Sequence, residues 1–252
     1  WGALYTDWGK AVAACHEGDI ARAINIKPSK NSSSDVDNFA DCFVSYHEGC
    51  YYLQNLEWRK AIKPLQQAKS EIKDKSDWCK EIDRLCEAQR QKIDDFDEHL
   101  QLSEFWYELL NSQTGRSYFA ECKARKVAQN LDNKKISLQE GLNELHEIRN
   151  IDSNNSSTLD LIKKVEYSLE AEKIDRLMKQ NQFEQAISVA RQSKNEKIRF
   201  RVAEICIDLL LEGTESRSLN FEAMQQLGQW AYELCPHEPA FMPFYLQLGI
   251  YR

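Results

Sequence analysis

One short phrase recurs along this chain: a bulky apolar residue, two further residues, and then Ala-Ile. The clear copies begin at Ile20, Trp58 and Phe183, and weaker copies begin at Phe96, Leu138 and Phe221. These six markers span 201 residues in five steps, so the mean period is about 40 residues. A period of this size is the sequence signature of stacked supersecondary units, each of which buries its apolar face against its neighbours.

The sequence between the markers is typical of α-helix. Only 9 Gly and 5 Pro occur among 252 residues, and long stretches are rich in Glu, Lys, Gln, Leu and Ala, which are good helix formers. Apolar residues recur at helical spacing, as in Val202, Ile205, Cys206 and Leu209. Because no strand pattern competes, we expect an all-α fold in which each marker opens the second helix of a helix-turn-helix unit.

The expected helices follow from these markers and from the loop compositions between them. First helices are expected near 3–17, 37–55, 76–93, 116–131, 157–180 and 196–212. Second helices are expected near 19–27, 57–72, 95–111, 137–150, 182–194 and 219–235, and a last helix begins near 239. Ser157 and Asn220 are the expected N-caps of two of them. Pro64 should kink or end its helix because it removes one backbone hydrogen bond.

The second unit carries the most complete pattern of small and bulky residues. Its residues Gly49, Tyr52, Trp58, Ala61, Leu65 and Ala68 follow at steps of 3, 6, 3, 4 and 3. This spacing resembles the tetratricopeptide repeat (TPR), a helix-turn-helix unit of about 34 residues. A small residue at Gly49 would let the two helices approach. The resemblance implies an α-solenoid of about six TPR-like units plus a final helix, irregular because the period exceeds 34 and because His99 and Gly141 replace the family's alanine.

The resemblance also implies how the chain is organised. We expect N-terminal units over 1–112, aromatic-lined, continuous with C-terminal units over 113–252. The chain begins at Trp1 rather than Met and ends in a stretch like the opening of another helix, so it is expected to be a piece of a longer multidomain protein. No charged leader precedes an apolar core, so no signal peptide is predicted. No apolar run approaches the roughly 20 residues that span a bilayer.

The net charge and the cysteine content indicate which partners and which cellular compartment to expect. The formal net charge is −7, which argues against non-specific nucleic-acid binding. The eight cysteines include no C-x-x-C pair, so free buried thiols in a reducing compartment are expected, with the cytoplasm as the default location.

In the TPR family the first helices line a concave surface that holds extended peptides or partner helices, and the resemblance carries this surface over to particular positions. They are Tyr5, Trp8, Val12, Phe43, Tyr46, Cys50, Arg84, Lys92, Lys123, Lys126, Asn130, Lys134 and Lys179. The implied groove is aromatic at its N-terminal end and basic in the middle. Residues 116–135 carry six basic against two acidic side chains, a local charge of +4. This stretch is either a solvated helix face or a site for an acidic peptide segment.

Weaker signals of chemistry all have structural explanations. His47 and Cys50 lie one helical turn apart, which suits a metal site or a Cys-His pair, but their helix is already explained as a repeat helix. "CPH" (235–237) could supply a thiolate haem ligand, but it contains the proline that ends a repeat. "DDFDEH" (94–99) could recruit a cation, but a solvated turn or helix cap explains it. Lys126 and Asn130 resemble the start of a TPR carboxylate clamp, yet Glu172 stands where a second Asn is expected. No catalytic, cofactor or metal site is therefore expected.

Three functions remain as expectations. The first is a non-catalytic protein–protein interaction scaffold that binds a peptide or partner domain in the groove. The second is a regulatory arm of an enzyme whose catalytic domain lies outside this piece. The third is an RNA-binding helical repeat, which the acidic charge of −7 disfavours.

Overall fold

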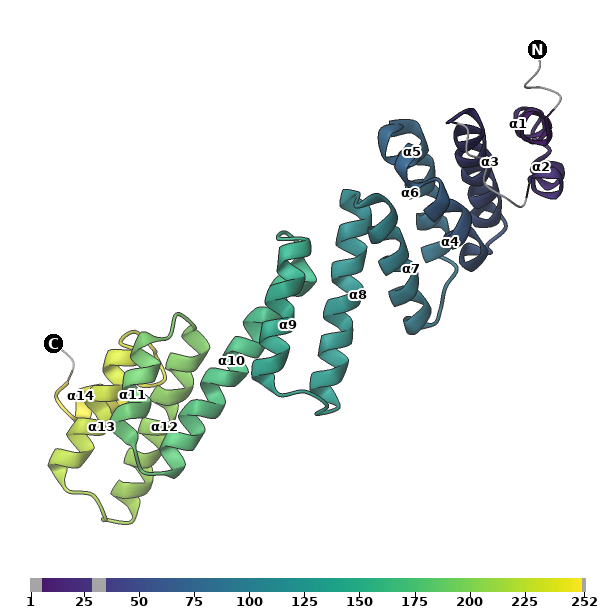
Figure 1. Ribbon diagram of the computed structural model, residues 1–252. Helices are drawn as coiled ribbons and strands as arrows, with labels where there is room; N and C mark the ends of the chain where they lie inside the picture. The colour runs from purple at the N-terminus through teal and green to yellow at the C-terminus, as the bar shows by residue number, and fades with distance from the viewer. Residues whose placement is uncertain (1–5, 29–34, 251–252) are drawn as a thin grey trace. The chain divides into compact units, whose positions relative to one another are not determined.

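The computed structural model describes residues 6–28 and 35–250. Over these residues it contains fourteen helices and no strand, so the fold is all-α as expected (Figure 1). The helices of the first half are α1 (Asp7–His16), α2 (Ile20–Ile26), α3 (Asp35–Gln54), α4 (Trp58–Gln67), α5 (Lys69–Asp74), α6 (Ser76–Arg90) and α7 (Phe96–Leu110). Those of the second half are α8 (Gln113–Asp132), α9 (Leu138–Ile151), α10 (Ser156–Lys179), α11 (Phe183–Gln192), α12 (Glu196–Glu215), α13 (Phe221–Leu234) and α14 (Met242–Gln247). None of these helices combines the length and apolarity needed to cross a membrane.

Every marker residue of the repeated phrase is the first residue of a helix. Ile20, Trp58, Phe96, Leu138, Phe183 and Phe221 open α2, α4, α7, α9, α11 and α13. In the three clear copies the alanine three residues later is fully buried. The alanine is small, so a neighbouring helix packs closely over it, which explains why the phrase recurs.

Two details of the helix ends differ from the expectation. The helix expected over 57–72 is divided at Ala68, and Pro64 lies inside its first part, α4. Of the two predicted caps, Asn220 is confirmed, since its side chain accepts a hydrogen bond from the Ala223 N–H at 2.8 Å and caps α13. The prediction of Ser157 as the second cap is wrong. Asn155 caps α10 instead, accepting from the Thr158 N–H at 3.0 Å.

The chain divides into two compact units. The first comprises the described residues up to 132 together with 144–159, and the second comprises 133–143 and the described residues from 160 onward. The division expected at residue 112 separates two groups of continuous repeats and stays a prediction, while α7 and α8 both lie in the first compact unit. Trp106 of α7 contacts Tyr118 of α8 with ring centroids 5.9 Å apart, and Tyr107 stacks on Phe119 at 4.8 Å.

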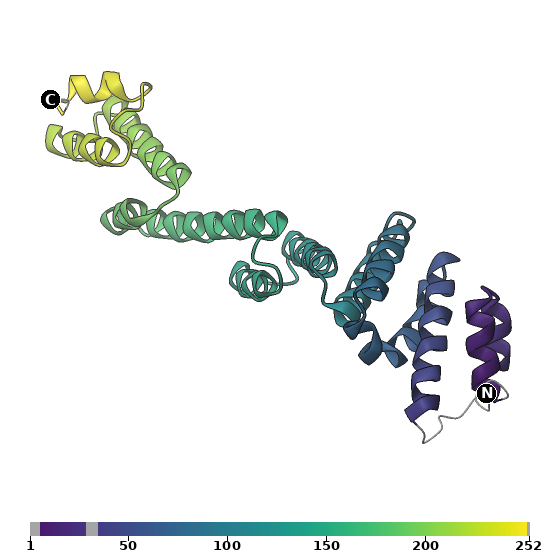
Figure 2. The same cartoon turned by 90° about the horizontal axis from the view of Figure 1, so that it is seen from above.

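In the first unit, helical hairpins pack through small and aliphatic side chains. α1 lies beside α2 and α3 beside α4, while α3 also contacts α1 and α6 (Figures 1 and 2). Gly49 of α3 lies directly against Leu65 of α4: a Cβ added there would be 2.3 Å from the Leu65 Cγ. The close approach of α3 and α4 therefore requires glycine at this position, as the repeat pattern predicted.

The second unit has a core of its own. Ile174 of α10, Ile187 of α11, Ile198 of α12 and Tyr245 of α14 are fully or almost fully buried in one cluster. The Tyr245 hydroxyl donates a hydrogen bond to the Cys235 carbonyl oxygen at 3.1 Å, which ties α14 to the end of α13.

Candidate functional site

Four side chains of α3 and one of α6 form a cluster that we call the aromatic surface: Phe39, Phe43, Tyr46, His47 and Trp78. The α3 members follow at helical spacing and so share one face of that helix. Tyr46 stacks on Trp78 with centroids 3.8 Å apart and an angle of 5° between the ring planes. The centroid of the Phe43 ring is 6.0 Å from that of Trp78 and 4.5 Å from that of His47.

A lysine lies over the exposed part of this surface. The Lys75 Nζ is 4.0 Å from the Trp78 ring centroid and 4.7 Å from that of Phe39. It also forms an ion pair of 3.8 Å with Glu71, so its charge is partly balanced. Phe39 is 51% exposed, and Phe43 and Trp78 are half-buried. The surface thus offers water-accessible aromatic area with a cation beside it, and cation–π contacts hold that cation in place.

The ionisable rings of the aromatic surface, and the thiol of Cys50 next to Tyr46, are kept neutral. Burial lowers the pKa of His47, and the positive charge that the nearby His16 can carry lowers it further. Burial raises the pKa of Tyr46 and raises that of Cys50 to about 12. All eight cysteines are free thiols, and burial is the first cause of a raised pKa in each of them. None has the lowered pKa of a nucleophilic thiolate.

His47 should make stability depend on pH. In the unfolded chain it titrates near 6.5, and in the folded protein its pKa lies lower. Between the two pKa values the unfolded state therefore binds more protons than the folded state. The stability that neutral His47 contributes is fully present above the unfolded pKa and is lost as the pH falls through the folded pKa. Urea midpoints measured at about pH 7.5 and 5.5 should fall more for the parent than for a His47→Gln variant. Parallel pH profiles for the two proteins would contradict this assignment.

The structure exposes the predicted groove residues to different extents. Tyr5 lies outside the described residues, while Trp8 and Tyr46 are only 6% exposed and serve the core. Cys50 is also buried, and Val12 packs partly buried against the cluster around Trp8. Only Phe43 presents aromatic area at the surface among the predicted aromatic positions described. Three side chains complete the aromatic surface but were not among the predicted groove residues: Phe39, His47 and Trp78.

The predicted basic positions are divided between the two units. In the first unit Arg84 pairs with Glu81 at 2.7 Å, and Lys92 is exposed. Asn130 is half-buried on α8, and Lys134 and Lys179 are exposed in the second unit.

Two lysines of the basic stretch contact the protein's own side chains. Lys123 lies over the Phe119 ring at 5.3 Å, and Lys126 pairs with Asp97 at 3.4 Å. Lys123 thus contacts its own helix α8, and Lys126 connects α8 to α7.

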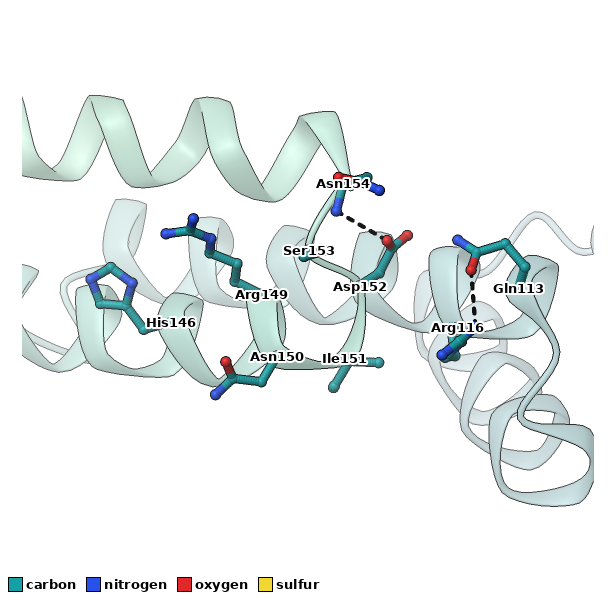
Figure 3. Close-up of a pocket in the computed structure, with 9 residues that line it drawn as sticks. All are labelled: Gln113, Arg116, His146, Arg149, Asn150, Ile151, Asp152, Ser153 and Asn154. Carbon is teal, nitrogen blue, oxygen red and sulfur yellow. Dashed lines mark hydrogen bonds between the residues drawn. The ribbon is translucent and has the colours of Figure 1, made fainter.

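A second feature of the first unit is a polar pocket of about 570 Å³ (Figure 3). Gln113 and Arg116 reach it from the first turns of α8, His146 and Arg149 come from α9, and Asp152 comes from the following loop. Sequence reasoning included Arg116 in the basic stretch but missed Arg149. The two arginines lie 33 positions apart in the sequence, so only the packing of α8 and the α9–α10 loop places both in the lining of one pocket.

Among known proteins, no protein-family model matches the chain, and no curated protein matches it.

Proposed function

We propose that this chain is a non-catalytic protein–protein interaction module, built from TPR-like helical hairpins, that binds a peptide segment of a partner. The aromatic surface is the proposed binding site. The observation that carries this proposal is the water-accessible aromatic area of Phe39, Phe43 and Trp78 around Lys75.

The composition of the surface suits a peptide anchor. Aromatic side chains supply most of the binding energy at protein interfaces, and a few of them dominate it. The stacking of Trp78 on Tyr46 fixes the orientation of the ring before a partner arrives, and such preorganisation lowers the entropic cost of binding. Lys75 adds a cation at the edge, so the preferred segment carries an apolar residue next to an acidic one.

The test uses peptides selected from a random display library against the full chain, with their affinities measured by calorimetry. A Phe39→Ser variant should bind the selected peptides at least about fivefold more weakly, because an exposed anchor is removed. Phe221→Ser is the matched control: it makes the same change at a phenylalanine that is 60% exposed in the second unit.

Retention of full affinity by Phe39→Ser, or an equal loss in both variants, would contradict binding at the aromatic surface. Because Phe39 is 51% exposed, its replacement should leave the fold intact, which equal circular dichroism spectra and urea midpoints would verify.

A further inference from the structure

The polar pocket of the first unit contains two guanidinium groups without a charged partner. Neither Arg116 nor Arg149 forms an ion pair with any described residue, Asp152 included. In the same unit Arg84 and Arg90 do form ion pairs, with Glu81 and Glu121. Two unpaired arginines that line one pocket are an arrangement that attracts an anion.

The hydrogen bonding of Arg116 is also incomplete. Its Nη2 donates to the Gln113 Oε1 at 3.0 Å, which holds the side chain at the pocket. Its Nε is buried, yet it has no hydrogen-bond partner among the described residues. A buried donor without an acceptor is destabilising, so a ligand oxygen that reaches this Nε–H would recover the lost hydrogen-bond free energy.

The charge balance of the pocket selects the class of anion. Asp152 is only 8% exposed, and its carboxylate accepts a hydrogen bond from the Asn154 N–H at 3.2 Å. Two arginines and this carboxylate leave a formal charge of +1. One carboxylate group on a ligand neutralises that charge and matches the fork of a guanidinium. A phosphate dianion would leave an excess negative charge beside the buried Asp152.

We propose that this pocket binds a carboxylate group of an acidic peptide segment, with Arg116 and Arg149 as the charged contacts and Asn150 and Gln113 as further donors. The proposal rests on the proposed function, because it names the chemistry of the peptide that the interaction module binds. The carboxylate comes from an Asp or Glu side chain or from a peptide C-terminus, and the two sources are separable by experiment.

Three probes are titrated into the full chain and followed by calorimetry and by the arginine Nε–Hε resonances in NMR spectra. They are the peptide Ac-GEEEG-NH2, which has only side-chain carboxylates, the peptide Ac-GQQQG-OH, which has only a terminal one, and inorganic phosphate. The Arg116 resonance should move on saturable binding of one or both peptides. Arg149→Gln should weaken that binding by at least about fivefold, since a charge-assisted bidentate contact is lost.

The matched control is Arg176→Gln, which removes the same charge at an exposed position of α10 in the second unit. It should change the affinity by less than about twofold, as expected of a remote solvent-screened charge. Equal losses in the two variants, no saturable peptide binding, or tighter binding of phosphate than of either peptide would each overturn the proposal.

The outcomes also separate this proposal from the proposed function. Library-selected peptides that lose affinity in Phe39→Ser but not in Arg149→Gln would leave the interaction module standing and remove the carboxylate pocket from it. If neither variant affects any peptide, both proposals fail.

Discussion

Replacing Trp106 by alanine should lower the free energy of unfolding of the first unit by about 4 kcal/mol. Trp106 is one of the largest fully buried side chains and lies in the cluster that joins α4, α6, α7 and α8. Its removal loses the transfer free energy of the indole ring and leaves a cavity that the packed helices close only in part. Urea unfolding followed by far-UV circular dichroism measures the effect.

The loss has a second source in a hydrogen-bonded chain. The Trp106 Nε1–H donates to the Asp83 carboxylate at 2.6 Å, and the Ser112 hydroxyl donates to the same oxygen at 2.7 Å. Ser112 in turn accepts from the Gly115 N–H at 3.1 Å, at the beginning of α8. Trp106 therefore also helps to hold the helix turn that presents Gln113 and Arg116 to the polar pocket.

A Trp106→Phe variant separates packing from hydrogen bonding. It keeps most of the ring volume but removes the donor to Asp83, so we expect a smaller loss of about 1–2 kcal/mol. If Trp106→Ala cost less than about 1 kcal/mol, the surrounding helices would have to collapse into the cavity, and Trp106 would not be central to this core.

Replacing Lys27 by methionine should cost about 3 kcal/mol, because it leaves two buried carboxylates without their cation. The Lys27 Nζ lies 3.4 Å from Asp41 and 3.2 Å from Glu48, and it donates to the Ser45 hydroxyl at 2.7 Å. The side chains of Lys27 and Glu48 are only 17% and 16% exposed. This network joins the end of α2 to α3, and Gln67 at the end of α4 donates to the same Asp41. Chemical denaturation at neutral pH measures the loss.

The matched variant neutralises the whole network. Lys27→Met combined with Asp41→Asn and Glu48→Gln removes the unpaired charges while keeping the side-chain sizes, so it should recover at least half of the lost stability. A loss below about 1 kcal/mol for Lys27→Met alone would show that the network contributes no more than an exposed surface pair.

Some features of this molecule depend on neighbouring residues in the chain, and the amino-acid sequence was sufficient to predict them. Helical periodicity and the recurring phrase located every marker residue, such as Trp58 and Phe183, at the first residue of a helix. The glycine of the second repeat, Gly49, was also interpreted correctly, since it allows α4 to approach through Leu65. Such signals act over one or two helical turns, within which neighbouring residues alone set the backbone conformation.

Tertiary packing decided the features that depend on distant residues. The TPR resemblance placed Trp8 and Tyr46, on two different helices, in the predicted groove, but it could not indicate that neighbouring helices bury both rings. It likewise could not indicate that Trp78 stacks on Tyr46, or that Arg149 reaches the pocket of Arg116.

The sequence by itself thus determined where the six marker helices begin, and it identified Gly49 as a small residue that lets two helices pack. The tertiary structure alone decided which aromatic and charged side chains stay accessible. The physical reason is that a side chain's exposure depends on all the elements packed around it, whereas its helical position depends on its neighbours in the chain.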